Sequence, residues 1–393
     1  EQAAYHLGLI HLKEGDFFDP SLAVKYLKEI SKNSNNYSAL FQLVKLHLYQ
    51  PEKAEDITPD YLMTSLNKLV QDDVTIKQRN QALYYLALLH LQDDSELFNP
   101  LIANQYLWEA ATTGNTEERN YTALFQIAKL QLYKKEPAVI VTETHRLLSE
   151  LELLHEKSTD IILRYRAAYY LGLLYLQEES EQYNKAIGIE YLWLVAEAGI
   201  GSESASALFR LAKIQLREES DKSLIEPNKL IVALKRLNEN PTEAEQSLNY
   251  HCRSAYYLGL LYLQEQSEHY SIDIALSLLN PLADNGYTSA QASLGSFYLW
   301  GKHGRRDIKQ GKMWLEKAAE QDYEPAKNQL EMYKNILQNK LIYSSYKLLN
   351  SMYTNLVFSS QNKQAYATER ATESIKLQKE RFRKNKIRSS YLE

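Results

Sequence analysis

Apolar residues recur with helical spacing along most of the chain, in nine stretches that align on one pattern. Each stretch places a small residue, usually Ala, four positions before an apolar anchor. Successive anchors are 36 to 47 residues apart, which is typical of repeats built from two helices. The pattern predicts an all-α, right-handed solenoid of about eight helix-turn-helix repeats. The anchors are Leu7, Leu43, Leu86, Ile127, Leu171, Leu211, Leu258, Leu294 and Leu330.

The second helix of each repeat is predicted between the anchors. Four second helices are predicted to begin at a proline, which is tolerated in a first helical turn because the N–H that it lacks would have no partner there. Two further second helices, which lack a proline, are predicted over 139–154 and 186–198. Three tryptophans are assigned to equivalent core positions of second helices, Trp108, Trp193 and Trp314. The prolines that open second helices are Pro20, Pro59, Pro100 and Pro227.

Residues 290–326 carry the fullest copy of the pattern, A-x3-L-G-x2-Y-x2-G, followed by Trp314 and K-A-A. Gly301 and Gly304 are predicted to end the first helix, and Asp307 to cap the second. Gly295 lies inside the first helix, where glycine costs about 1 kcal/mol relative to alanine. We therefore predict that the second helix approaches closely there, and also at the counterparts Gly8, Gly172 and Gly259.

This copy resembles the Sel-one-like repeat, a relative of the tetratricopeptide repeat, although Gly311 and Asp322 stand where that family usually has Ala and Gly. The resemblance implies a non-catalytic scaffold or adaptor whose first helices line a concave, protein-binding surface. Related proteins include exported adaptors of bacterial envelope assembly and the enhanced-entry proteins of intracellular pathogens. The implied setting is the bacterial periplasm or the exterior, with an envelope enzyme or exporter component as partner.

A second period runs over the first. The first helices of the odd repeats read AYHLGLIHL, LYYLALLHL, AYYLGLLYL and AYYLGLLYL, whereas those of the even repeats read ALFQLVKLHL, ALFQIAKLQL and ALFRLAKIQL. Repeats of two kinds therefore alternate up to the seventh anchor, and the plain pattern follows from Asp284 onward.

The positions three and six residues after the small residue, called positions 3 and 6 below, share one face of each first helix. This face is aromatic and aliphatic in odd repeats and amide or basic in even ones. We predict that it binds the partner, with Tyr as anchors and Lys or Arg pairing with acidic groups. Alternatively, the Tyr residues pack on the next helix and the Lys residues are only solvated. The predicted contacts are Gln42, Lys45, Tyr85, Gln126, Lys129, Tyr170, Arg210, Lys213 and Tyr257.

The chain is predicted to comprise a repeat array (1–330), a capping helix (331–353) and a basic C-terminal helix or tail (354–393). Residues 363–393 hold nine Lys or Arg against four Asp or Glu, in a chain of net charge −5. That tail supports a second hypothesis, a repeat module of a larger nucleic-acid-processing enzyme. Residue 1 already lies inside a repeat helix, so we expect the chain to be part of a longer protein with any export signal upstream.

No catalytic motif, cofactor site or metal-ligand spacing is found in the sequence. The lone Cys252 excludes an internal disulfide, and no apolar run is long enough to span a membrane. Three histidines, His11, His47 and His90, occupy a repeat slot that other copies fill with Tyr175, Tyr262 and Tyr298. Because tyrosine fills the same slot in other copies, we interpret these histidines as packing residues and not as groups that transfer protons. We therefore predict no enzymatic activity and no cofactor.

Overall fold

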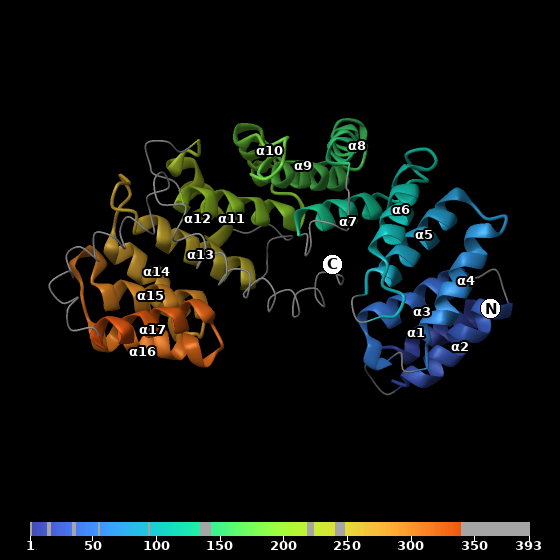
Figure 1. Cartoon of the computed structure of the whole chain (residues 1–393), viewed down its shortest axis with the longest axis horizontal. Helices are drawn as coiled ribbons and strands as arrows, with labels where there is room; N and C mark the ends of the chain where they lie inside the picture. Colours follow the sequence, from blue (N-terminus) through green and yellow to red (C-terminus); the bar gives the residue numbers. More distant parts are fainter. Residues whose placement is uncertain are drawn as a thin grey trace. The chain divides into compact units, whose positions relative to one another are not determined.

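The computed structural model describes residues 2–338 except 14–16, 34–36, 54–55, 93–94, 134–142, 218–223 and 240–247, and this part is helical without strands (Figure 1). The first helices of the repeats are α1 (Gln2–His11), α3 (Tyr37–Tyr49), α5 (Ile76–His90), α7 (Tyr121–Leu132), α9 (Ile161–Tyr175), α11 (Gly201–Arg217), α13 (Leu248–Tyr262), α15 (Thr288–Trp300) and α17 (Glu324–Gln338). The second helices are α2 (Pro20–Asn33), α4 (Pro59–Gln71), α6 (Pro100–Thr112), α8 (Thr144–Lys157), α10 (Lys185–Ala198), α12 (Pro227–Glu239), α14 (Ile272–Asp284) and α16 (Ile308–Glu320).

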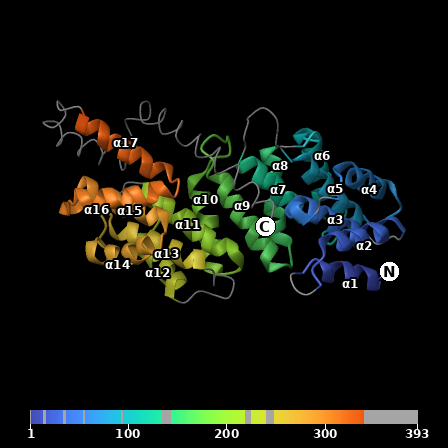
Figure 2. The ribbon, with the colours of Figure 1, turned by 90° about the horizontal axis from the view of Figure 1, so that it is seen from below.

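The described helices fall into two compact units, one ending at Tyr170 and the other beginning at Leu171, both inside α9. Within each unit, first and second helices alternate along the chain (Figure 2), and neighbouring helices pack on one another, as α5 does on α6 and α15 does on α16. This is the repeat stacking that the anchors predict. The range predicted as a capping helix begins inside α17, which the structure describes as far as Gln338, and residues 339–393, with the basic tail, lie outside the described residues.

Second helices begin where the sequence predicts. All four proline-initiated helices start at their proline, and α10 starts one residue before its predicted beginning. The described part of α8 starts at Thr144, following an undescribed stretch. Asp307 caps α16 as predicted, because its carboxylate accepts the Gln310 N–H at 2.9 Å.

The capping residue of each odd repeat, and of the eighth, also ties the second helix to the first. Its backbone N–H donates to a carbonyl in the last turn of the first helix, at 2.9 Å in every case. This bond satisfies one of the carbonyls that a helix end leaves open. The pairs are Asp19 with His11, Asn99 with His90, Asn184 with Tyr175, Ser271 with Tyr262, and Asp307 with Tyr298.

The predicted close approach of the two helices is confirmed at the glycines. A Cβ on Gly295 would lie 2.6 Å from Leu315 Cγ, and one on Gly259 would lie 2.7 Å from Leu279 Cγ. The equivalent distance at Gly8 is 3.2 Å, to Leu27 Cγ. Because real Cβ atoms hardly ever come closer than about 3 Å, the tighter crossings require glycine.

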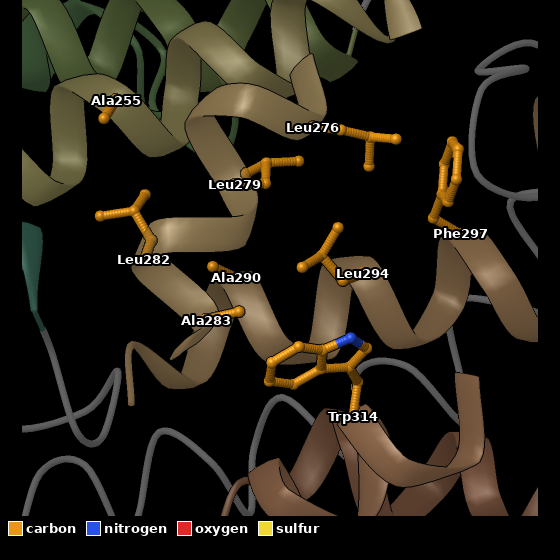
Figure 3. Close-up of a cluster of buried hydrophobic side chains, with 9 residues drawn as sticks. All are labelled: Ala255, Leu276, Leu279, Leu282, Ala283, Ala290, Leu294, Phe297 and Trp314. Carbon is orange, nitrogen blue, oxygen red and sulfur yellow. The ribbon is translucent and has the colours of Figure 1, made fainter. Parts of the chain in front are cut away.

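The core lies between consecutive repeats, as the cluster in Figure 3 shows. Leu276 and Leu279 of α14 face Leu294 and Phe297 of α15, and Trp314 of α16 closes the cluster from the far side. These residues are between 0 and 8% exposed. Each repeat therefore buries its apolar face only with the help of its neighbours.

The predicted equivalence of the three tryptophans is wrong for Trp314. Trp108 and Trp193 are the ninth residues after their caps, Asn99 and Asn184, whereas Trp314 is the seventh after Asp307. Two residues of helix turn a side chain to nearly the opposite face. Trp314 thus joins the core, while Trp108 and Trp193 turn toward the next second helix.

Candidate functional site

The tyrosines of the predicted binding face lie in the seams between neighbouring first helices. Each packs against the phenylalanine at position 2 of the preceding first helix, with ring centroids 5.3 to 5.5 Å apart; two pairs are stacked and the Phe41–Tyr85 pair is tilted by 42°. Their exposed fractions are only 4, 8 and 6% for Tyr85, Tyr170 and Tyr257. This is the packing alternative left open by the sequence, so these rings are not exposed anchors for a partner. The pairs are Phe41 with Tyr85, Phe125 with Tyr170, and Phe209 with Tyr257.

Two arginines that sequence reasoning missed lie in two of these three seams. The Arg253 guanidinium lies 4.3 Å from the Phe209 ring centroid, and Arg166 lies 5.7 Å from that of Phe125. Each arginine stands four residues before the stacking tyrosine, on the same face of its helix. The pattern Arg-x3-Tyr in α9 and α13 is the signal that could have identified them. Such cation–aromatic contacts contribute about 0.5–2 kcal/mol each.

The seam between α13 and α15 follows the same geometry with polar atoms. Tyr256, at position 2, places its hydroxyl 3.1 Å from Ser293 Oγ, at position 3 of the next first helix. Burial raises the pKa of the Tyr256 hydroxyl above its ordinary range, against the effect of this bond. Burial also raises the pKa of neighbouring Tyr287 to about 12. Position 2 of one first helix therefore faces position 3 of the next.

The polar members of the predicted face are more accessible. Lys45 and Lys213 are exposed, Gln42, Lys129 and Arg210 are half-buried, and Gln126 is buried. They lie on α3, α7 and α11, the first helices of the even repeats, and the lysine slot recurs every 84 residues. The structure thus leaves a set of basic positions accessible, which suits carboxylate groups of a partner.

The histidine slot has a structural role in the odd repeats. His11 Nδ1 lies 2.7 Å from the Phe17 carbonyl and His90 Nδ1 lies 2.7 Å from the Leu97 carbonyl, so each ring holds the loop after its own helix. His47, in an even repeat, differs. Burial lowers its pKa, and a hydrogen bond with Gln92 acts in the opposite direction.

Among the residues that the structure describes, no three His, Cys, Asp or Glu side chains are placed to hold a metal ion. No described helix combines the length and apolar character needed to cross a membrane.

Solved structures of repeat proteins resemble this chain. A Sel1 repeat protein from Oxalobacter formigenes matches with a TM-score of 0.51 and 16% identity, over 84% of this chain and 87% of that one. A protective antigen of uropathogenic Escherichia coli strains with an SLR fold matches with a TM-score of 0.44 and 16% identity, over 90% of this chain and 76% of that one.

Sequence comparisons add nothing to this, since no family model and no curated protein matches the chain. At 16% identity, the first structural likeness concerns the fold alone. It agrees with the alternating helices and with the copy at residues 290–326. The chain therefore has the fold of the Sel-one-like (Sel1) repeat proteins, an all-α solenoid of helix-turn-helix repeats.

Proposed function

We propose that this chain is a non-catalytic scaffold that binds a protein partner along the first helices of its repeats. Solenoids of this kind present extended surfaces, because each repeat contacts only its neighbours. The observation that carries the proposal is the recurrent basic slot at position 6, occupied by Lys45, Lys129 and Lys213. Core packing gives no reason to place a lysine at the same slot of the second, fourth and sixth repeats.

The chemistry of this surface favours an acidic partner. Gln42 and Arg210, which are half-buried, stand one turn before Lys45 and Lys213 and add amide or guanidinium donors on the same face. Carboxylates of the partner pair with these groups, which chiefly accelerates association. The buried tyrosines contribute indirectly, because their stacking on phenylalanine holds neighbouring first helices together.

Site-specific cross-linking tests the proposal. A photoreactive amino acid replaces Lys45, Lys129 or Lys213 in the protein produced in cells of its source organism. We expect all three positions to capture one and the same protein. The matched control is Val232, which is 66% exposed on second helix α12. Capture of that protein from Val232 but from none of the lysine positions contradicts the proposal.

Charge reversal provides the second test, once that partner is purified. Lys129→Glu with Lys213→Glu is expected to slow association, more strongly at low salt because screening is weaker there. Dissociation changes less. Equal association rates for the reversed and the natural protein at every salt concentration would remove the basic slot from the binding face.

The cellular setting belongs to the same proposal. The resemblance of residues 290–326 supports a bacterial adaptor in the periplasm or outside the cell, serving envelope assembly or host interaction. Fractionation of source cells with an antibody against the protein tests this. The rival module of a nucleic-acid-processing enzyme is favoured instead if deletion of residues 363–393 abolishes partner binding while the lysine changes do not.

A further inference from the structure

A pocket of about 460 Å³ opens between the second helices α10 and α12. Both helices belong to the unit that begins at Leu171. The residues that give the pocket its chemistry are Glu190, Trp193, Leu194, Glu197, Leu224 and Lys229. This surface is separate from the proposed binding face, which is on first helices.

The floor of the pocket is apolar and accessible. Leu194 is 40% exposed and Leu224 is 55% exposed, which is a large fraction for two neighbouring aliphatic side chains. Trp193 is half-buried. Trp108 stands at the same place after its own cap but is only 8% exposed, because the Arg146 guanidinium covers it at 4.2 Å from the ring centroid. The α10 tryptophan therefore keeps ring surface that a ligand can cover.

The rim carries an excess of negative charge. Glu190, Trp193, Leu194 and Glu197 are spaced i, i+3, i+4 and i+7, so the two carboxylates flank the apolar floor along one face of α10. Lys229 of α12 lies 4.4 Å from the Trp193 ring centroid and forms an ion pair with Glu197. Glu190 forms no ion pair with any residue that the structure describes. One ammonium thus faces two carboxylates.

We propose that this pocket binds a short segment of a partner protein in which an aliphatic side chain lies next to a lysine or arginine. The aliphatic side chain covers Trp193, Leu194 and Leu224, and the cation pairs with Glu190. The charge complementarity is opposite to that of the first-helix face, which takes acidic groups. This inference rests on the proposed scaffold function and adds a second surface to it.

Fluorine NMR of the full chain tests the pocket. The four tryptophans are labelled with 5-fluorotryptophan and assigned by single Trp→Phe variants. The probes are the peptides acetyl-GKLLKG-amide and, as the charge-reversed control, acetyl-GELLEG-amide. We expect the basic peptide to shift the Trp193 resonance saturably at millimolar concentration. The acidic peptide leaves it in place, and neither peptide moves the Trp108 resonance.

Three variants fix the location. Leu224→Asp should abolish the shift, and Glu190→Gln should weaken peptide binding by about two- to fivefold, as expected for one exposed ion pair. Val232→Asp, on α12 but outside the pocket, should change nothing. Circular dichroism verifies that each variant is folded. The proposal is overturned if the basic peptide gives no shift, if both peptides shift Trp193 equally, or if the shift survives Leu224→Asp.

This result is independent of the first-helix face. A shift that survives Lys45→Glu with Lys213→Glu supports the pocket, while loss of the shift in that variant contradicts it. Conversely, partner capture from Lys45 and Lys213 that continues in the Leu224→Asp protein leaves the scaffold function standing even if the pocket fails.

Discussion

Glycine, which has no Cβ atom, allows the two helices of a repeat to cross closely. A Cβ on Gly311 would lie 2.4 Å from the backbone nitrogen of Leu299, the shortest such distance among the described glycines. Gly311 stands where the Sel-one-like repeat usually has alanine. At this position α16 packs directly against the backbone of α15, which leaves no room for a methyl group. In α5 and α6 the positions equivalent to Gly295 and Gly311 hold Ala87 and Ala103, which are both fully buried. The crossing of α5 and α6 therefore accommodates methyl groups.

The first prediction compares these two crossings. We expect Gly311→Ala to lower the free energy of unfolding by about 1–3 kcal/mol through overpacking. This loss overrides the gain of about 1 kcal/mol in helix propensity. The matched variant Ala103→Gly should cost about 1 kcal/mol, because it loses helix propensity without relieving a clash. Denaturant midpoints measure both, and a stabilised Gly311→Ala protein would show that α16 moves away from α15 without cost.

His47 gives a pH dependence. Its pKa is lowered from 6.5 mainly by burial, so the unfolded chain takes up the proton first as the pH falls below that value. The stability that neutral His47 contributes is therefore fully present above pH 6.5, and it declines as the pH falls below that value. His47→Gln should lose less stability than the natural protein between about pH 7.5 and about pH 5.5. Urea titrations at both pH values measure this.

Exposed His145 on α8 provides the control for that comparison. His145→Gln shows whether the loss of any one histidine changes the curve. An identical pH response in the natural protein and in His47→Gln would remove His47 as a source of acid sensitivity.

Pairs of elements explain the alternation of repeat kinds. Phenylalanine at position 2 of an even repeat packs against tyrosine at position 3 of the following odd repeat, as Phe125 and Tyr170 show. The sequence identified both positions and the alternation. It did not show which side of a first helix meets its neighbour, because the periodicity of one helix contains no information on its rotation against another. Tyr170 was therefore predicted to be a partner contact, when its ring belongs to a seam.

The third prediction concerns this seam. Tyr170→Ala should reduce stability by about 3–5 kcal/mol, since a buried ring is removed. A double-mutant cycle of Phe125→Leu and Tyr170→Leu should give a coupling of about 0.5–1.5 kcal/mol, the contribution of ring stacking beyond burial. Tyr183→Ala, which removes a 41% exposed ring, is the control and should have little effect. Zero coupling would mean that the rings share a seam without stabilising it.

Capping residues also join one helix of a repeat to the other. Asp307→Ala should destabilise the protein by about 0.5–2 kcal/mol through loss of the Gln310 N–H acceptor. The bond from the Asp307 N–H to the Tyr298 carbonyl remains, since it uses backbone atoms only. Asp307→Asn retains an acceptor and should retain most of the stability. Equal losses in thermal unfolding for the two variants would rule out the side-chain bond as the cause.

For the whole molecule, the sequence predicted the helix order and the second-helix starts, because anchors, caps and prolines are local signals. The division into two compact units inside α9 was not predicted, since it depends on which distant helices contact one another. The basic slots at Lys45, Lys129 and Lys213 follow from the sequence alone, and their binding role stays a prediction. The α10–α12 pocket could not be found in this way, because it depends on side chains from two helices and the segment before α12.

The fifth prediction follows from contacts that are limited to neighbours. Destabilisation by Gly311→Ala should spread only through adjacent elements. Hydrogen exchange read by mass spectrometry should accelerate in α14 to α17 and stay unchanged in α5 and α6. Faster exchange throughout the chain would instead indicate a single cooperative unit, in which the cost at one crossing is shared by all helices.

The rule that position 2 faces position 3 also limits how such an array can lengthen. Duplication of one even repeat would set Phe125 against a second copy of Gln126, leaving an aromatic ring beside an amide. Duplication of an even repeat together with the odd repeat that follows it restores each phenylalanine to a tyrosine. Gain or loss of repeats therefore preserves these phenylalanine–tyrosine seams only when repeats are added or removed in pairs.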